Sequence, residues 1–157
     1  MSVEEAFARE AGHAQGKVRR FADYVRLHGG QGKLIFVETE QELLKEGLSS
    51  FELTLDEAKG ILFSVSNSGS TVLESQVEQY LQPFLIQMSK KSKISRKEFK
   101  ELVEIYTTMT HNAVEKPVAE KRVKSIVQRK GLKAKRDWLR LGSRKWYNRI
   151  ETAADKT

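Results

Sequence analysis

The chain has 157 residues, of which 39% are hydrophobic and 31% charged, and its formal net charge is +7 at pH 7. This length and composition predict one domain with a hydrophobic core and an appended segment, and they exclude global disorder. The absence of cysteine excludes disulfides, thiolate metal sites and cysteine nucleophiles.

The first third of the chain is predicted to form helices on either side of a glycine-rich loop. Residues 3–15 are rich in alanine and have an apolar side of Val3, Ala6 and Phe7. From residue 17 the apolar residues follow the spacing of one helix face, namely Val18, Phe21, Ala22 and Val25. The glycines near residue 30 end this helix. Residues 33–37 are predicted to be extended, and residues 38–47 to be a helix closed by Gly47.

The next segment repeats this order. Thr54 and Glu57 form a capping box at the start of a periodic apolar run. After a polar loop at residues 66–71, a long apolar stripe is expected to be buried, consisting of Leu73, Val77, Tyr80, Leu81, Phe84, Leu85 and Met88. Pro83 lies inside this stretch, so a kink or a break is expected near it.

The remaining elements are also predicted to be helical. A second capping box, Ser95 with Glu98, precedes a helix that we interpret as an extra helix packed onto the preceding ones. Residues 111–117 are the best candidate for a domain boundary, and Pro117 suits the first turn of a new helix. The predicted class is all-α, with a body at residues 1–110 and a basic, tryptophan-containing helical extension at residues 111–157.

Two of these segments align as a repeat. Placing Ile35 opposite Val72, an offset of 37 residues, also brings Phe21 opposite Ala58 and Val25 opposite Leu62. This pattern resembles a pair of EF-hands over about residues 17–88. The resemblance implies a four-helix body whose two loops, at residues 28–39 and 65–76, touch through a short β-bridge at Ile35 and Val72.

The predicted loops lack the ligands of a calcium site. Such a loop needs oxygen ligands at its positions 1, 3 and 5 and a bidentate Glu at position 12. These positions hold His28, Gly30, Gly32 and Thr39 in the first loop, and Val65, Asn67, Gly69 and Gln76 in the second. We therefore expect calcium-silent units that bind no metal and act as protein-binding or structural modules.

The positive charge is concentrated near the C-terminus. Residues 116–149 contain thirteen Lys or Arg against two acidic residues, and the rest of the chain has a net charge of about −4. Such polarity indicates an acidic partner. The candidate partner-binding residues of this basic arm are Lys121, Arg122, Lys124, Arg129, Lys130, Lys133, Lys135, Arg136, Trp138, Arg140, Arg144, Lys145, Trp146 and Arg149.

Other chemistry has no support in the sequence. The three histidines are isolated, and no nucleophile elbow, zinc helix, phosphate loop or dinucleotide fingerprint occurs. No enzyme activity and no cofactor are therefore expected. The longest aliphatic or aromatic run, residues 34–37, is far shorter than the ~20 residues of a membrane span, and the acidic start is no secretory signal. We expect an intracellular protein, cytoplasmic by default.

These observations predict a non-enzymatic, calcium-independent adaptor. Its EF-hand-like body would bind a protein assembly, and its basic arm would bind an acidic partner such as an acidic protein filament. A nucleic-acid-binding protein is the alternative, in which residues 116–150 contact RNA or DNA and the tryptophans stack on bases. Peripheral membrane contact and a target helix for calmodulin-like proteins also remain open.

Overall fold

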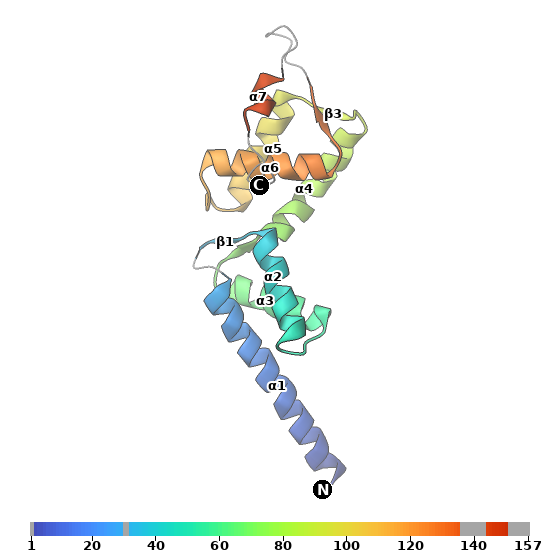
Figure 1. The fold of residues 1–157 in the computed structure, drawn as a ribbon, viewed down its shortest axis with the longest axis vertical. Helices are drawn as coiled ribbons and strands as arrows, with labels where there is room; N and C mark the ends of the chain where they lie inside the picture. Colours follow the sequence, from blue (N-terminus) through green and yellow to red (C-terminus); the bar gives the residue numbers. More distant parts are fainter. Residues whose placement is uncertain (1, 30–31, 136–143, 151–157) are drawn as a thin grey trace. The chain divides into compact units, whose positions relative to one another are not determined.

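The computed structural model describes residues 2–29, 32–135 and 144–150. The chain divides into two compact units, unit 1 at Met1–Glu74 and unit 2 at Ser75–Thr157. Both units consist of α-helices joined by turns and two-residue strands, which confirms the all-α class (Figure 1).

In unit 1, residues 2–29 and 32–74 form three helices and one bridge of two short strands. Its elements are α1 (Val3–His28), β1 (Leu34–Ile35), α2 (Val37–Ser49), α3 (Leu55–Ser68) and β2 (Val72–Leu73). Three helices begin with a reciprocal capping box, which satisfies backbone N–H groups that the first turn leaves unpaired. Two of these boxes, Thr54 with Glu57 and Ser95 with Glu98, confirm the sequence prediction, and Ser2 with Glu5 adds a third.

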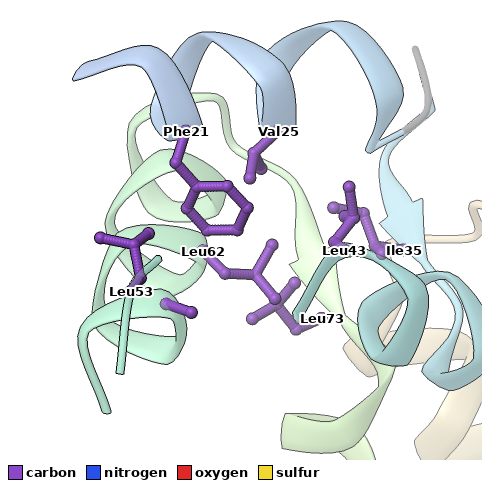
Figure 2. Close-up of a cluster of buried hydrophobic side chains, with 8 residues drawn as sticks. Phe21, Val25, Ile35, Leu43, Leu53, Leu62 and Leu73 are labelled. Atoms are coloured by element: carbon purple, nitrogen blue, oxygen red, sulfur yellow. The ribbon is translucent and has the colours of Figure 1, made fainter. Parts of the chain in front are cut away.

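The hydrophobic core of unit 1 forms where these elements meet. Figure 2 shows Phe21 and Val25 of α1 pointing towards Leu43, Leu62 and Leu73. Ile35, Leu53 and Ala58 complete the buried cluster. The predicted helical face of Phe21 and Val25 is therefore the buried face of α1, whereas Val18 is 41% exposed.

The bridge of unit 1 differs in register from the prediction. β1 and β2 are parallel, with Leu34 opposite Val72 and Ile35 opposite Leu73, so Val72 does not pair with Ile35. The reason is burial: Ile35 and Leu73 both point into the core, and a register shift of one residue would turn one of them outward. The parallel direction also means that no two-fold axis through the bridge relates the two strands.

The described residues of unit 2 form four helices and a second bridge. Its elements are α4 (Glu74–Ser89, whose first residue belongs to unit 1), β3 (Lys93–Ile94), α5 (Arg96–Met109), α6 (Lys116–Arg129), β4 (Lys133–Ala134) and α7 (Lys145–Asn148). β3 and β4 are parallel, with Lys93 opposite Lys133 and Ile94 opposite Ala134. The order helix, two-residue strand, helix therefore recurs at β3, and β4 likewise follows a helix, α6.

This arrangement changes the interpretation of two segments. Residues 96–109 are not an extra helix: α5 follows β3 and leads into α6, against which it packs. The division between compact units falls after Glu74, whereas the sequence placed a boundary after residue 110. The pairing of β3 with β4 and the packing of α5 on α6 join the two sides of residue 110, so the basic extension is part of unit 2.

Three local predictions are also corrected. Gly47 does not close a helix, because α2 continues to Ser49 and Gly47 is buried beneath the ring of Phe21. α4 continues through Pro83, so the helix is not broken there. Pro83 is exposed, and water can bond the carbonyl group that lacks a helical donor. Tyr80 and Phe84 are 54% and 38% exposed, and only the rest of the predicted stripe in α4 is buried.

Candidate functional site: a lysine-rich face on unit 2

Two lysines lie side by side on the outer face of the β3–β4 bridge. Lys93 and Lys133 are opposite each other in the parallel register, and both are exposed. Ile94 and Ala134, the next residues along each strand, are 0% and 3% exposed and point into unit 2. Because successive side chains of a strand alternate between faces, both lysine side chains leave the same outer face.

The bridge of unit 1 provides an internal comparison. Its outer positions are Leu34 and Val72, and its inner positions, Ile35 and Leu73, are buried like those of unit 2. The outer aliphatic pair of one bridge is thus replaced by two ammonium groups in the other. Like charges directly opposite each other destabilise a strand pair, so the fold alone does not favour this replacement.

Further lysines surround this pair. Because β3 and β4 are parallel, the turns that precede them lie at the same end of the bridge, and these turns carry Lys90, Lys91 and Lys130. Lys135 follows β4 and donates its backbone N–H to the carbonyl oxygen of Ile94 at 2.7 Å. We call this set the lysine face: Lys90, Lys91, Lys93, Lys130, Lys133 and Lys135, all of them exposed.

One carboxylate lies at the edge of the lysine face. Glu98 accepts a hydrogen bond from the backbone N–H of Ser95 at 2.7 Å, and Lys91 Nζ lies 3.5 Å from its other carboxylate oxygen. The Ser95 N–H, followed by the Ser95 hydroxyl and the charges of Lys91 and Lys135, lowers the pKa of Glu98 despite its partial burial. Glu98 therefore stays ionised and offsets part of the positive charge at one side of the face.

Some residues of the predicted basic arm are structural instead. Lys124 is 6% exposed, and its Nζ donates to the backbone carbonyl oxygens of Tyr147 at 3.1 Å and Ile150 at 2.5 Å. Arg129 forms an ion pair with Glu78 and so links α6 to α4. A buried cation, or one held in a close ion pair by a neighbouring helix, has little capacity left for an external partner, and we remove Lys124 and Arg129 from the candidate set. Lys91 stays in the lysine face, because its side chain is 60% exposed and its ion pair with Glu98 is longer, at 3.5 Å.

The aromatic residues of the arm pack against α5. The ring centroids of Trp146 and Phe99 are 5.6 Å apart, and those of Tyr147 and Phe99 are 5.8 Å apart. The indole N–H of Trp146 donates to the carbonyl oxygen of Lys135 at 3.4 Å. Burial raises the pKa of the Tyr147 phenol. Trp146 is thus part of the packing of unit 2 beside the lysine face.

The other predicted residues have varied positions. Lys130, Lys133, Lys135, Lys145 and Arg149 are exposed, and Lys121, Arg122 and Arg144 are half-buried. Arg136, Trp138 and Arg140 lie outside the described residues. Sequence reasoning missed Lys90, Lys91 and Lys93 as candidates, because they precede the arm in the sequence and Lys93 is 40 residues from Lys133, the residue it lies opposite. The available signal was the concentration of lysines at residues 90–93.

The carboxylate of Glu74, in the second loop predicted for unit 1, has a structural role. Glu74 is fully buried, and its Oε2 accepts a hydrogen bond from the backbone N–H of Val37 at 3.1 Å. This bond satisfies a donor in the first turn of α2, where a carboxylate also complements the helix dipole. Within residues 2–29, 32–135 and 144–150, no three His, Asp or Glu side chains gather as a metal site would require.

Comparison with known proteins gives no match, whether with protein-family models, with curated proteins or with solved structures. In the described part of the chain, no helix combines the length and the apolar character that crossing a membrane requires.

Proposed function

We propose that the protein is a non-enzymatic adaptor whose unit 2 binds an acidic macromolecule through the lysine face. The observation that carries this proposal is the opposition of Lys93 and Lys133 on a bridge whose counterpart in unit 1 has Leu34 and Val72. Two adjacent ammonium groups repel each other in the free protein, and an anionic partner would turn that repulsion into attraction.

The charge of the two units supports the same proposal. Unit 2 contains twenty Lys and Arg residues against nine Asp and Glu, a net charge of +11. Unit 1 contains eight against twelve, a net charge of −4. The segregation therefore follows the structural units and not only the C-terminal arm. In this proposal unit 2 binds the acidic partner, and unit 1 presents a separate surface to another protein.

An acidic protein surface is the partner that we favour. Binding of single-stranded nucleic acid usually combines a basic groove with aromatic rings on which bases stack. Trp146, one of the aromatic residues expected to stack, packs against Phe99 and Tyr147 and donates its N–H within the chain. Nucleic acid remains the second candidate, because six exposed lysines also match the phosphates of a nucleic-acid backbone.

The decisive experiment compares two pairs of substitutions with equal changes in charge. Lys93→Gln with Lys133→Gln alters the lysine face, whereas Lys97→Gln with Lys116→Gln alters two exposed lysines of unit 2 outside it. The probes are fluorescently labelled polyglutamate and a labelled single-stranded RNA of mixed sequence, and binding is measured by anisotropy. We expect the first pair to weaken polyglutamate binding at least about tenfold and the second pair to have a much smaller effect.

Equal losses of polyglutamate affinity for both pairs of substitutions would show that binding depends only on net charge. The lysine face would then be rejected as a site. RNA binding that is tighter than polyglutamate binding, and equally sensitive to Lys93 and Lys133, would replace the acidic protein with nucleic acid as the partner.

Calcium independence is part of the proposal and has its own test. It rests on the ligand positions of the sequence and on the structural use of Glu74, which caps α2. Isothermal titration of the intact chain with calcium should give no binding heat in the micromolar range, the range of calcium sensors. Micromolar binding would contradict this part of the proposal and leave the lysine face unaffected.

A further inference from the structure

The N-terminal half of α1 is a helix that no other described residue of unit 1 covers. Residues 2–15 are all exposed, and in Figure 1 this half of the helix extends away from α2 and α3. Val3 is 72% and Phe7 68% exposed. A helical segment of this length is marginally stable in water unless one of its faces is packed against another surface. Its exposed phenylalanine therefore indicates a contact outside unit 1.

The exposed half of α1 has one apolar stripe with acidic sides. Val3, Phe7, Ala11 and Ala14 are spaced so that they line one face of the helix. At 100° per residue, Glu4 and Glu10 lie on the two sides of Phe7, and Arg9 lies on the opposite face. The stripe would fit an apolar pocket with a basic rim.

Unit 2 has a pocket of this chemistry. The pocket has a volume of about 500 Å³ and lies between the first turns of α5 and α6 and residues 146–150, which include part of α7. Its apolar lining consists of Phe99, Pro117, Val118, Trp146 and Ile150. Its basic lining consists of Arg96, Lys100, Lys121 and Arg149, against one acidic residue, Glu120. None of these residues belongs to the lysine face.

We propose that this pocket binds the N-terminal half of α1 from a second copy of the chain. Phe7 enters between Val118 and Trp146, where burial of its ring supplies the main favourable term. Glu4 and Glu10 then face basic side chains of the rim, among them Lys100 and Arg149. The contact is a helix-in-groove interface, and it is separate from the acidic partner that we propose for the lysine face.

Sedimentation velocity over a range of protein concentrations tests this contact with the full chain. We expect the sedimentation coefficient to rise with concentration. One variant carries Glu4→Lys and Glu10→Lys in α1, and another carries Lys100→Glu and Arg149→Glu in the pocket. Each should lower the association constant at least about tenfold, because like charges then face each other.

An equimolar mixture of the two variants is the sharpest measurement. The pocket of the first variant and the α1 of the second variant are unaltered, so the mixture should recover association that neither variant shows alone. The control variant, Lys97→Glu with Lys116→Glu, changes the charge of unit 2 equally outside the pocket and should associate like the unaltered chain.

Three results would overturn the proposal. The chain could stay monomeric at every concentration. The pocket variant could associate like the unaltered chain, which would assign the contact to pairing between α1 helices. The mixture could fail to recover association although circular dichroism shows both variants to be folded.

A peptide titration covers the case in which a variant does not fold. A peptide of residues 2–16 is added to the chain carrying Trp138→Phe, so that Trp146 is the fluorescent residue. We expect a saturable change in the emission of Trp146. A Phe7→Ala peptide should bind at least about tenfold more weakly than the unaltered peptide. No change with the unaltered peptide would contradict the contact.

Discussion

Lys124 and Tyr147, 23 residues apart in the sequence, are joined by two interactions within unit 2. Lys124 Nζ donates to the Tyr147 carbonyl oxygen at 3.1 Å and lies 4.6 Å from the centroid of the tyrosine ring. The lysine thereby fixes α7 against α6, and its charge is used inside the protein. A basic residue in a basic segment is thus a structural element here, because burial decides its role.

Replacing Lys124 by methionine should destabilise unit 2. The substitution keeps the apolar stem but leaves the carbonyl oxygens of Tyr147 and Ile150 without this donor, at a cost of about 1–3 kcal/mol. Urea denaturation measures the change. Lys130→Met, at an exposed position of the same segment, is the control and should change stability by less than about 0.5 kcal/mol. Equal effects at the two positions would contradict the structural role of Lys124.

Gly47→Ala should destabilise unit 1 although alanine favours helices. A Cβ at position 47 would lie 2.8 Å from Cζ of Phe21 and 3.2 Å from the Cβ of Ala58. Overpacking of this kind costs about 1–3 kcal/mol. Gly60 lies in α3 with open space at its Cβ position, so Gly60→Ala should instead stabilise by about 0.5–1 kcal/mol. Thermal unfolding of both variants measures whether each substitution raises or lowers stability. If Gly47→Ala raised the stability, the ring of Phe21 could not pack against position 47 as described.

Glu74→Gln should weaken the first turn of α2. The neutral amide can still accept the hydrogen bond of the Val37 N–H, but it loses the favourable interaction of a carboxylate with the helix N-terminus. We expect a loss of about 1 kcal/mol, and faster hydrogen exchange of the Val37 amide. The exposed Glu42 of the same helix is the control position, and Glu42→Gln should leave that exchange rate unchanged.

The stability of unit 2 should depend on the ionisation of Glu98. Its pKa is lower in the folded protein than in the unfolded chain, chiefly because the Ser95 N–H donates to the carboxylate. The stabilisation is therefore fully present above the unfolded pKa, about 4.3, and is lost as the pH falls through the folded pKa.

Urea midpoints at neutral and acidic pH test this dependence. Glu98→Gln should be less stable than the unaltered chain at pH 7, and the difference should shrink as the pH falls below the unfolded pKa. The exposed Glu101, on the same helix, serves as control. A difference that is constant over this range would contradict the role of the Glu98 charge.

Much of the local structure could be predicted because its determinants are close in the sequence. The capping boxes at Thr54 and Ser95 need only a residue three positions away, and they mark the starts of α3 and α5. The periodic spacing of Phe21 and Val25 identified the buried face of α1. The concentration of positive charge was also visible in the sequence. It was assigned only to the C-terminal arm, whereas it extends over unit 2.

The candidate site was only partly predictable, because its residues come from separate segments. Lys133 and Lys135 were among the expected residues, but Lys93 joins them only through the pairing of β3 with β4. The same limit applies to Tyr80 and Phe84, whose spacing suits a buried face although they are exposed. Periodicity shows that a face is apolar and does not show whether another element covers it.

The sequence by itself determined the all-α class, the starts of two helices and the segregation of charge. These properties depend on residue chemistry and on spacing within one or two helical turns. Tertiary structure decided the role of individual residues: Gly47 accommodates Phe21, Lys124 fixes Tyr147, and Lys93 lies beside Lys133. Each of these outcomes depends on a contact between distant segments, which fixes the burial and the charge environment of a side chain.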